Sequence, residues 1–104
     1  MRLIELNLTR IIELCRKHRV KALSVFGSIL TDRFNDKSDI DLLVDFEPYN
    51  PEDLDFDYLD NYLDLADSLE QLFDRKVDLV VEKALRNKYF ISNVNRTKQL
   101  IYGG

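Results

Sequence analysis

The sequence of 104 residues has little of several residue types, and each shortage excludes a class of protein. A single cysteine, Cys15, excludes an internal disulfide, which favours a reducing compartment and predicts a cytoplasmic protein. No apolar run approaches the roughly 20 residues that span a bilayer, and the N-terminus has no stretch typical of a signal peptide, so we expect no membrane association. No internal repeat or low-complexity segment appears, and the length predicts one domain, residues 1–104.

Basic residues are missing from the middle of the chain. Residues 38–74 contain thirteen Asp and Glu and no Lys or Arg, whereas the flanking 1–37 and 75–104 are basic on balance. A nucleic-acid track needs clustered Lys and Arg, so we expect no extended nucleic-acid surface. The acidic middle suits attraction of metal cations or a basic protein partner, and its plainer interpretation is the solvated face of a helix.

Hydrophobic periodicity predicts alternating helices and strands. Helices are predicted at 6–19, 28–32 and 53–73, and strands at 21–26, 39–46 and 76–81. A further helix is expected to begin within 83–89, and 97–102 is either an edge strand or a final helical turn. Three strands with intervening helices indicate an α+β (α/β layered) fold, with a short mixed sheet and helices packed mainly on one face.

The longest predicted helix carries an apolar stripe that includes Leu59, Leu63 and Leu69, which we expect to face the core. The aspartates opposite this stripe are expected to be solvated charges. His18, in a basic run near the end of the first helix, is also expected to be solvated. Two prolines within 48–51 predict a loop, which the family resemblance described below places beside the cleft.

Two carboxylates fall on the same face of the predicted strand 39–46. Asp39 and Asp41 alternate with Ile40 and Leu42, so an extended chain directs both acids one way and the apolar side chains toward a core. Two anions this close repel each other, and one takes up a proton unless something positive lies between them. A hard divalent cation with oxygen ligands, above all Mg²⁺, suits the pair.

Gly27 and Ser28 follow the apolar run 22–26. Glycine lets the backbone turn sharply and lets a ligand approach bare N–H groups. If the chain then enters a helix, those N–H groups and the Ser28 hydroxyl face an anion such as phosphate. One part of the segment 27–46 therefore suits phosphate, and the other suits the metal that accompanies phosphate.

Gly27-Ser28, ten further residues and Asp39-x-Asp41 together resemble the signature of the polymerase-beta-type nucleotidyltransferase superfamily. The resemblance is to its stand-alone branch, the minimal nucleotidyltransferase (MNT) domain often encoded beside a HEPN-domain toxin. That family expects a third carboxylate on a later strand, where this chain has Asp78. Many relatives follow Gly-Ser with a small residue, then Arg and Gly; this chain lacks that pattern, and Arg33 is the nearest substitute for a phosphate-facing charge.

The resemblance implies a nucleotidyltransferase with a two-metal Mg²⁺ site that moves AMP from ATP to an acceptor hydroxyl. It assigns catalysis and metal binding to Asp39, Asp41 and Asp78, and nucleotide phosphate binding to Gly27, Ser28 and Arg33. The implied acceptor is a HEPN-domain toxin, which would make this chain the antitoxin of the pair, in a homo- or hetero-oligomer.

Three alternatives stay open at this point. The first is that the chain is a binding module with a weak active site, which neutralises its toxin by occupancy. The second is that it is a small-molecule nucleotidyltransferase of the aminoglycoside type. The latter enzymes usually carry a second, substrate-binding domain, for which 104 residues leave no room. For Asp78 alone, the alternative to metal binding is a helix cap or an ion pair with Arg75.

Overall fold

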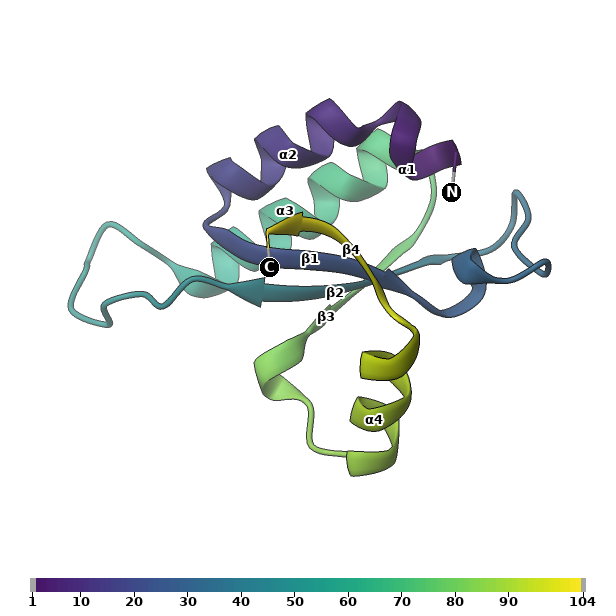
Figure 1. Ribbon diagram of the computed structural model, residues 1–104. Helices are drawn as coiled ribbons and strands as arrows, with labels where there is room; N and C mark the ends of the chain where they lie inside the picture. Colours follow the sequence, from purple (N-terminus) through teal and green to yellow (C-terminus); the bar gives the residue numbers. More distant parts are fainter. Residues whose placement is uncertain (1, 104) are drawn as a thin grey trace.

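The computed structural model describes residues 2–103. Its elements alternate much as the sequence predicts (Figure 1). In chain order they are α1 (Arg2–Leu6), α2 (Leu8–Lys17), β1 (Val20–Phe26), the 3-10 turn η1 (Gly27–Leu30), β2 (Ile40–Phe46), α3 (Tyr58–Phe73), β3 (Val77–Val81), the 3-10 turn η2 (Glu82–Ala84), α4 (Lys88–Thr97) and β4 (Gln99–Gly103). No helix among these residues is both long enough and apolar enough to cross a bilayer.

The four strands form one mixed sheet in the order β3-β2-β1-β4. β1 pairs antiparallel with both β2 and β4, and β2 pairs parallel with β3. Parallel neighbours need a crossover connection, which α3 supplies. The end of the chain is therefore the edge strand β4, the first of the two alternatives considered for it.

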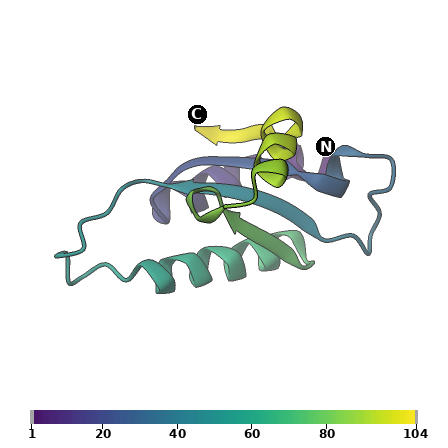
Figure 2. The same cartoon turned by 90° about the horizontal axis from the view of Figure 1, so that it is seen from below.

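Helices α1, α2 and α3 cover one face of the sheet, and α4 lies on the other (Figures 1 and 2). Most buried apolar side chains lie between the sheet and the first three helices. They include Cys15, whose burial raises the thiol pKa to about 12, as expected of a packed core thiol. On the α4 face a smaller cluster consists of Phe26, Leu43 and Val94, with Val80 and Leu85 against it. This arrangement is the predicted α+β layer.

The helix boundaries differ from the prediction where polar side chains interrupt the pattern. The predicted helix 6–19 corresponds to α2, Leu8–Lys17, and the short helix α1 precedes it. The two helices are separated by Asn7, whose side-chain amide donates to the Leu3 carbonyl at 2.8 Å. α3 begins at Tyr58 instead of residue 53, because the Asp57 carboxylate accepts the Asp60 N–H at 3.1 Å and caps the helix.

The predicted apolar stripe of α3 was wrong at two positions. Leu59 and Leu63 are 62% and 53% exposed, whereas Leu65 is fully buried. The Tyr62 hydroxyl donates to the Leu79 carbonyl of β3 at 2.5 Å. That bond, with the burial of Leu65, fixes the rotation of α3 about its axis and turns Leu59 and Leu63 outward.

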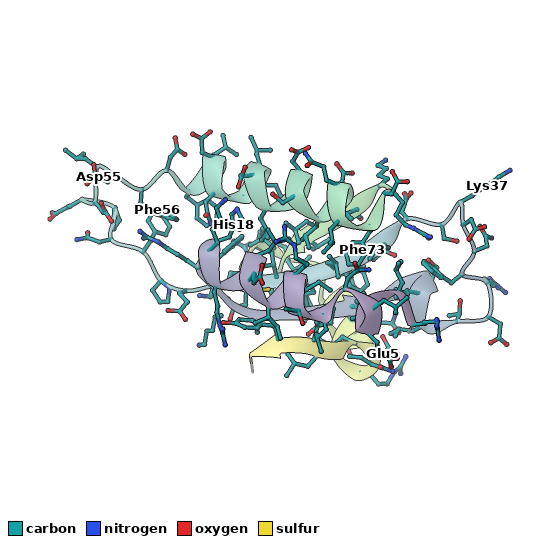
Figure 3. All side chains as sticks on the ribbon, turned by 90° about the horizontal axis from the view of Figure 1, so that it is seen from above. Glu5, His18, Lys37, Asp55, Phe56 and Phe73 are labelled. Atoms are coloured by element: carbon teal, nitrogen blue, oxygen red, sulfur yellow. The ribbon has the colours of Figure 1, made fainter. Side chains whose placement is uncertain are left out.

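His18 is buried, so the prediction that it is solvated was wrong. It is 2% exposed and lies between α2 and α3 (Figure 3). Its Nδ1 contacts the Leu14 carbonyl at 2.7 Å and its Nε2 contacts the Asp64 carboxylate at 2.5 Å. The Leu14 carbonyl and the ionised Asp64 carboxylate both present acceptor oxygens to the ring. Hydrogen bonding from His18 holds the pKa of Asp64 below its usual value.

The loop after β2, residues 47–57, does not lie beside the predicted carboxylates. It follows the last residue of β2, whereas Asp39 precedes the first. Figure 3 shows the two ends of the molecule, with Lys37 at one end and Asp55 at the other. The prediction that this loop lies beside the cleft was therefore wrong. The loop and the carboxylates lie at opposite ends of β2, separated by the length of that strand.

Candidate nucleotidyltransferase site

Asp41 and Asp78 are direct neighbours on adjacent parallel strands. The β2–β3 register pairs Asp41 with Asp78. Paired residues of neighbouring strands direct their side chains to the same face, here the face opposite the main core. Asp39 lies two residues before Asp41, immediately ahead of β2, and is exposed. The structure thus brings the three predicted carboxylates to one end of the sheet.

The three carboxylates repel one another, and the effect is concentrated on Asp41. Burial of this half-buried side chain raises its pKa most, and the charges of Asp78 and Asp39 raise the pKa further. A hydrogen bond from the Ser28 backbone acts in the opposite direction. The ionised form of Asp41 is therefore unfavourable here, and a bound cation would relieve the repulsion.

Gly27 lies directly against this cluster. Its φ of +76° is in the left-handed region, where residues with a Cβ are strained. A Cβ built on Gly27 would lie 2.3 Å from Oδ2 of Asp41, which is far inside contact distance. From the sequence, we expect Gly27 to allow a ligand close to the backbone. The structure adds that a Cβ at this position would force the Asp41 carboxylate to shift.

Ser28 continues the turn. Besides its backbone hydrogen bond to Asp41, its carbonyl accepts the Thr31 N–H at 2.9 Å and the Thr31 hydroxyl at 2.8 Å. These bonds close η1, a single 3-10 turn where the sequence predicts a helix at 28–32. The turn therefore holds Gly27 and Ser28 against the Asp41 carboxylate of β2.

Arg33 is exposed in the turn after η1, and its backbone N–H donates to the Thr31 hydroxyl at 3.2 Å. No contact of its side chain with the carboxylates is among those found in residues 2–103. The structure therefore brings the other five predicted residues together and leaves Arg33 apart from them.

Arg75 has a role that the sequence did not reveal. Its guanidinium lies 4.9 Å from the centroid of the Phe34 ring and donates to the Asn35 and Ser38 carbonyls at 3.0 and 3.2 Å. These contacts hold the loop that leads into Asp39. Among residues 2–103 no ion pair joins Arg75 to Asp78, which removes the ion-pair alternative for Asp78.

Magnesium suits the chemistry of the three carboxylates. Carboxylate oxygens are its preferred protein ligands, and the raised pKa of Asp41 is the response expected of a site that lacks a counter-charge. In the part of the chain that the structure describes, no three His, Cys, Asp or Glu side chains lie close enough to hold one metal ion. Residue type and register therefore fit the metal, and the side chains would have to turn toward it.

Asp45 lies on the same face of β2, two alternations beyond Asp41. It is half-buried and forms an ion pair with Lys83, with Oδ1 and Nζ 3.3 Å apart. Lys83 also donates to the Phe46 carbonyl at 3.3 Å. Asp45 is therefore already paired with a cationic side chain, whereas Asp41 forms no ion pair among residues 2–103.

A pocket of about 580 Å³ borders the same turn, between η1 and α4. It is lined by Phe26, Gly27, Leu30, Thr31, Phe90, Asn93, Val94, Thr97 and Gln99. Sequence reasoning missed it, because α4 reaches Gly27 only through the tertiary fold. No local motif in 88–99 signals such a contact.

Comparisons with known proteins agree with this geometry. The family model described as "Polymerase beta, Nucleotidyltransferase" matches residues 9–104. A Methanocaldococcus jannaschii protein, provisionally named a protein adenylyltransferase, is 32% identical over 104 residues, covering 92% of this chain and 97% of that protein.

Two solved structures have a similar fold. One, provisionally described as a minimal nucleotidyltransferase, has a TM-score of 0.73 and 28% identity and covers 92% of this chain and 90% of its own. The other contains a tri-AMPylated Shewanella oneidensis HEPN toxin with an MNT antitoxin; it matches with a TM-score of 0.65 and 24% identity over 96% of this chain and 72% of that one. The family match, the relative and the fold lead to one conclusion: this chain belongs to the polymerase beta-type nucleotidyltransferase family.

Proposed function

We propose that this protein transfers AMP from ATP to a hydroxyl group of a HEPN-domain toxin and is the antitoxin of that pair. The observation that carries the proposal is the register of β2 and β3, which sets Asp41 beside Asp78 next to the Gly27-Ser28 turn. The relative named for protein adenylylation and the fold shared with an MNT antitoxin bound to an AMPylated HEPN toxin support the choice of acceptor. In this proposal the protein acts in the cytoplasm, beside its toxin.

In this proposal Asp39, Asp41 and Asp78 hold Mg²⁺, and the turn at Gly27 and Ser28 binds phosphate through its backbone N–H groups and the serine hydroxyl. When bound, two magnesium ions supply neutralisation of phosphate charge and a lower pKa for the acceptor hydroxyl. Arg33 would have to move from its exposed turn to contribute a further positive charge.

The transfer itself is a balanced displacement at the α-phosphorus of ATP. The acceptor oxygen forms a bond to that phosphorus. The bond between the α-phosphorus and the oxygen that bridges the α- and β-phosphates breaks, and pyrophosphate leaves with the electron pair. The hydroxyl proton is lost to solvent. Such a reaction requires that the acceptor oxygen and the leaving group lie in line and that the phosphate charge is neutralised. Residues gathered at one end of a sheet can do both.

A weaker activity is the second candidate, and a specific observation favours it. The three carboxylates do not form a closed metal site as they stand, and the Arg-Gly pattern after Gly27-Ser28 is missing. In that case the protein would neutralise its toxin by binding alone. The two functions differ in one measurable product, the AMP-modified toxin.

The test is to incubate the full chain with the HEPN-domain protein encoded in its own genome, Mg²⁺ and ATP, and to measure the intact mass of that protein. We expect a gain of one or more AMP units. Asp41→Asn should lower the transfer rate by about 100-fold or more, because several kcal/mol of charge stabilisation depend on the metal.

Asp45→Asn is the matched control, since Asp45 lies on the same face of β2 but is paired with Lys83. It should keep the transfer rate within a few fold. An unchanged toxin mass in a complex that still forms would reject adenylylation in favour of neutralisation by binding. Equal losses in Asp41→Asn and Asp45→Asn would instead show that the carboxylate cluster has no special role.

A further inference from the structure

The pocket between η1 and α4 differs in chemistry from the carboxylate cluster beside it. None of its nine lining residues carries a charge. Phe26 and Val94, which line the pocket, are buried. Phe90, 38% exposed, lies edge-on to Phe26 with ring centroids 5.9 Å apart and an interplanar angle of 86°. A pocket with aromatic walls and no charge suits a flat, uncharged ring system. It does not suit a triphosphate.

The pocket lies where the base of a nucleotide could bind if its phosphates lay at the Gly27-Ser28 turn. Gly27 lines the pocket and also lies against Asp41, so the pocket and the carboxylates share a border at the turn. A ligand with its phosphates at Gly27-Ser28 can therefore place a flat group under α4 (Figure 2 shows α4 over this face of the sheet). The volume of about 580 Å³ lies in the range of about 300–1,000 Å³ that small-molecule sites occupy.

Two carboxamides give the pocket a polar edge. Asn93 accepts a hydrogen bond from Arg96 on its Oδ1 at 2.8 Å, which leaves its amide N–H groups to donate. Gln99, at the start of β4, is exposed and offers both a donor and an acceptor. The Thr97 hydroxyl donates a hydrogen bond to the Asn93 carbonyl at 2.9 Å, so its proton is already used. A carboxamide matches adenine, which presents an amino donor next to a ring-nitrogen acceptor.

We propose that this pocket binds the adenine base of ATP, with Phe90 against the face of the ring and Gln99 hydrogen-bonded to its amino edge. The inference rests on the proposed nucleotidyl transfer and adds the part of the substrate that the enzyme selects. Phe90 then supplies affinity for any base, because stacking is indifferent to base identity. Gln99 supplies the preference for adenine over guanine, because the corresponding edge of guanine presents two acceptors, O6 and N7, and no donor.

The test is calorimetric titration of the full chain with ATP, GTP and inorganic tripolyphosphate, each with Mg²⁺. Phe90→Ala should weaken ATP binding by about tenfold or more and leave tripolyphosphate binding unchanged. Tyr89→Ala is the matched control: Tyr89 precedes Phe90 on α4, is 90% exposed and does not line the pocket. It should leave the ATP affinity unaltered.

Gln99→Leu should reduce the ratio of ATP to GTP affinity by about fivefold or more, while Phe90→Ala weakens both nucleotides alike. Equal weakening of ATP and tripolyphosphate in Phe90→Ala, or an unaltered ATP to GTP ratio in Gln99→Leu, would overturn the assignment. An unaltered chain that binds no ATP would overturn it together with the proposed function. Base-selective ATP binding without transfer to the HEPN-domain protein would reject only the acceptor.

Discussion

The face of the sheet under α2 and α3 and the face that carries Asp41 and Asp78 differ in what their side chains contact. Along β2 the two faces alternate residue by residue. Ile40, Leu42 and Val44 are at most 1% exposed and join the main core. On the other face, Asp41 meets Asp78, and Leu43 joins only a small cluster beneath α4.

The difference shows how one strand can serve stability and chemistry together. Apolar burial on the first face is the main favourable term in folding. On the second face the ionised carboxylates oppose folding, since burial and mutual repulsion raise the pKa of Asp41. The charged site is therefore held in place by the core on the reverse side of the same strands. Substitutions on the two faces should have opposite effects on stability.

The largest effect is expected in the core. Leu65→Ala should lower the free energy of unfolding by about 2–5 kcal/mol, because Leu65 is fully buried between α3 and the sheet. Leu63→Ala, two residues earlier and 53% exposed, is the control and should change it by less than about 0.5 kcal/mol. Urea unfolding of both variants measures the difference. Similar losses of unfolding free energy in the two variants would mean that Leu65 does not face the core more than Leu63 does, which contradicts the rotation of α3 described above.

The next effect is at the border of the two faces. Gly27→Ala should cost about 1–2 kcal/mol for the positive φ alone, and more because its Cβ would collide with Asp41. In an Asp41→Ala background the collision disappears and the cost of the positive φ remains. Urea unfolding of the four chains gives the coupling between the two positions. Additive losses would contradict the close approach of Gly27 to Asp41.

A smaller effect, of opposite sign, is expected from Asp78→Asn. Removing this charge should lower the pKa of Asp41 toward its usual value of 3.8. A group whose folded pKa is raised favours folding at low pH, and that contribution is lost as pH rises through the folded pKa. At neutral pH the variant should therefore be slightly more stable than the unaltered chain.

An NMR titration of the Asp41 carboxyl group and urea unfolding at pH 7 check this expectation. Added Mg²⁺ should stabilise the unaltered chain more than Asp78→Asn, since a ligand that binds the folded state raises its stability. A less stable Asp78→Asn in the absence of metal would show that Asp78 has a structural partner. Asp45→Asn, which breaks the pair with Lys83, is the control and should not gain stability.

The smallest effect concerns the core face and depends on pH. Because His18 lowers the pKa of Asp64, the pair should contribute stability above the usual value of 3.8, which is lost as pH falls through the lowered pKa. The stability difference between the unaltered chain and Asp64→Asn should therefore shrink below about pH 3.8. Asp60→Asn on the same exposed helix face is the control. A difference that does not vary with pH would contradict the ion pair.

Much of the fold follows from local pattern. The alternation of apolar and acidic residues in 39–46 predicts a strand with two unlike faces, and the structure has this strand at Ile40–Phe46. Short-range periodicity did not predict the rotation of α3, because Leu59 and Leu63 extend the apolar stripe as well as Leu65 does. The choice between them depends on the Tyr62 hydrogen bond to β3, which is a contact between elements.

By itself, the sequence determined the chemistry at each position: which residues of β2 are acids, that a glycine precedes Ser28, and that the chain alternates helices and strands. Tertiary structure alone decided which distant residues meet. The register that sets Asp41 beside Asp78, the burial of His18 and the pocket under α4 all join segments far apart in the chain. Side-chain alternation is a property of the local backbone, whereas register and burial depend on how every element packs against the others.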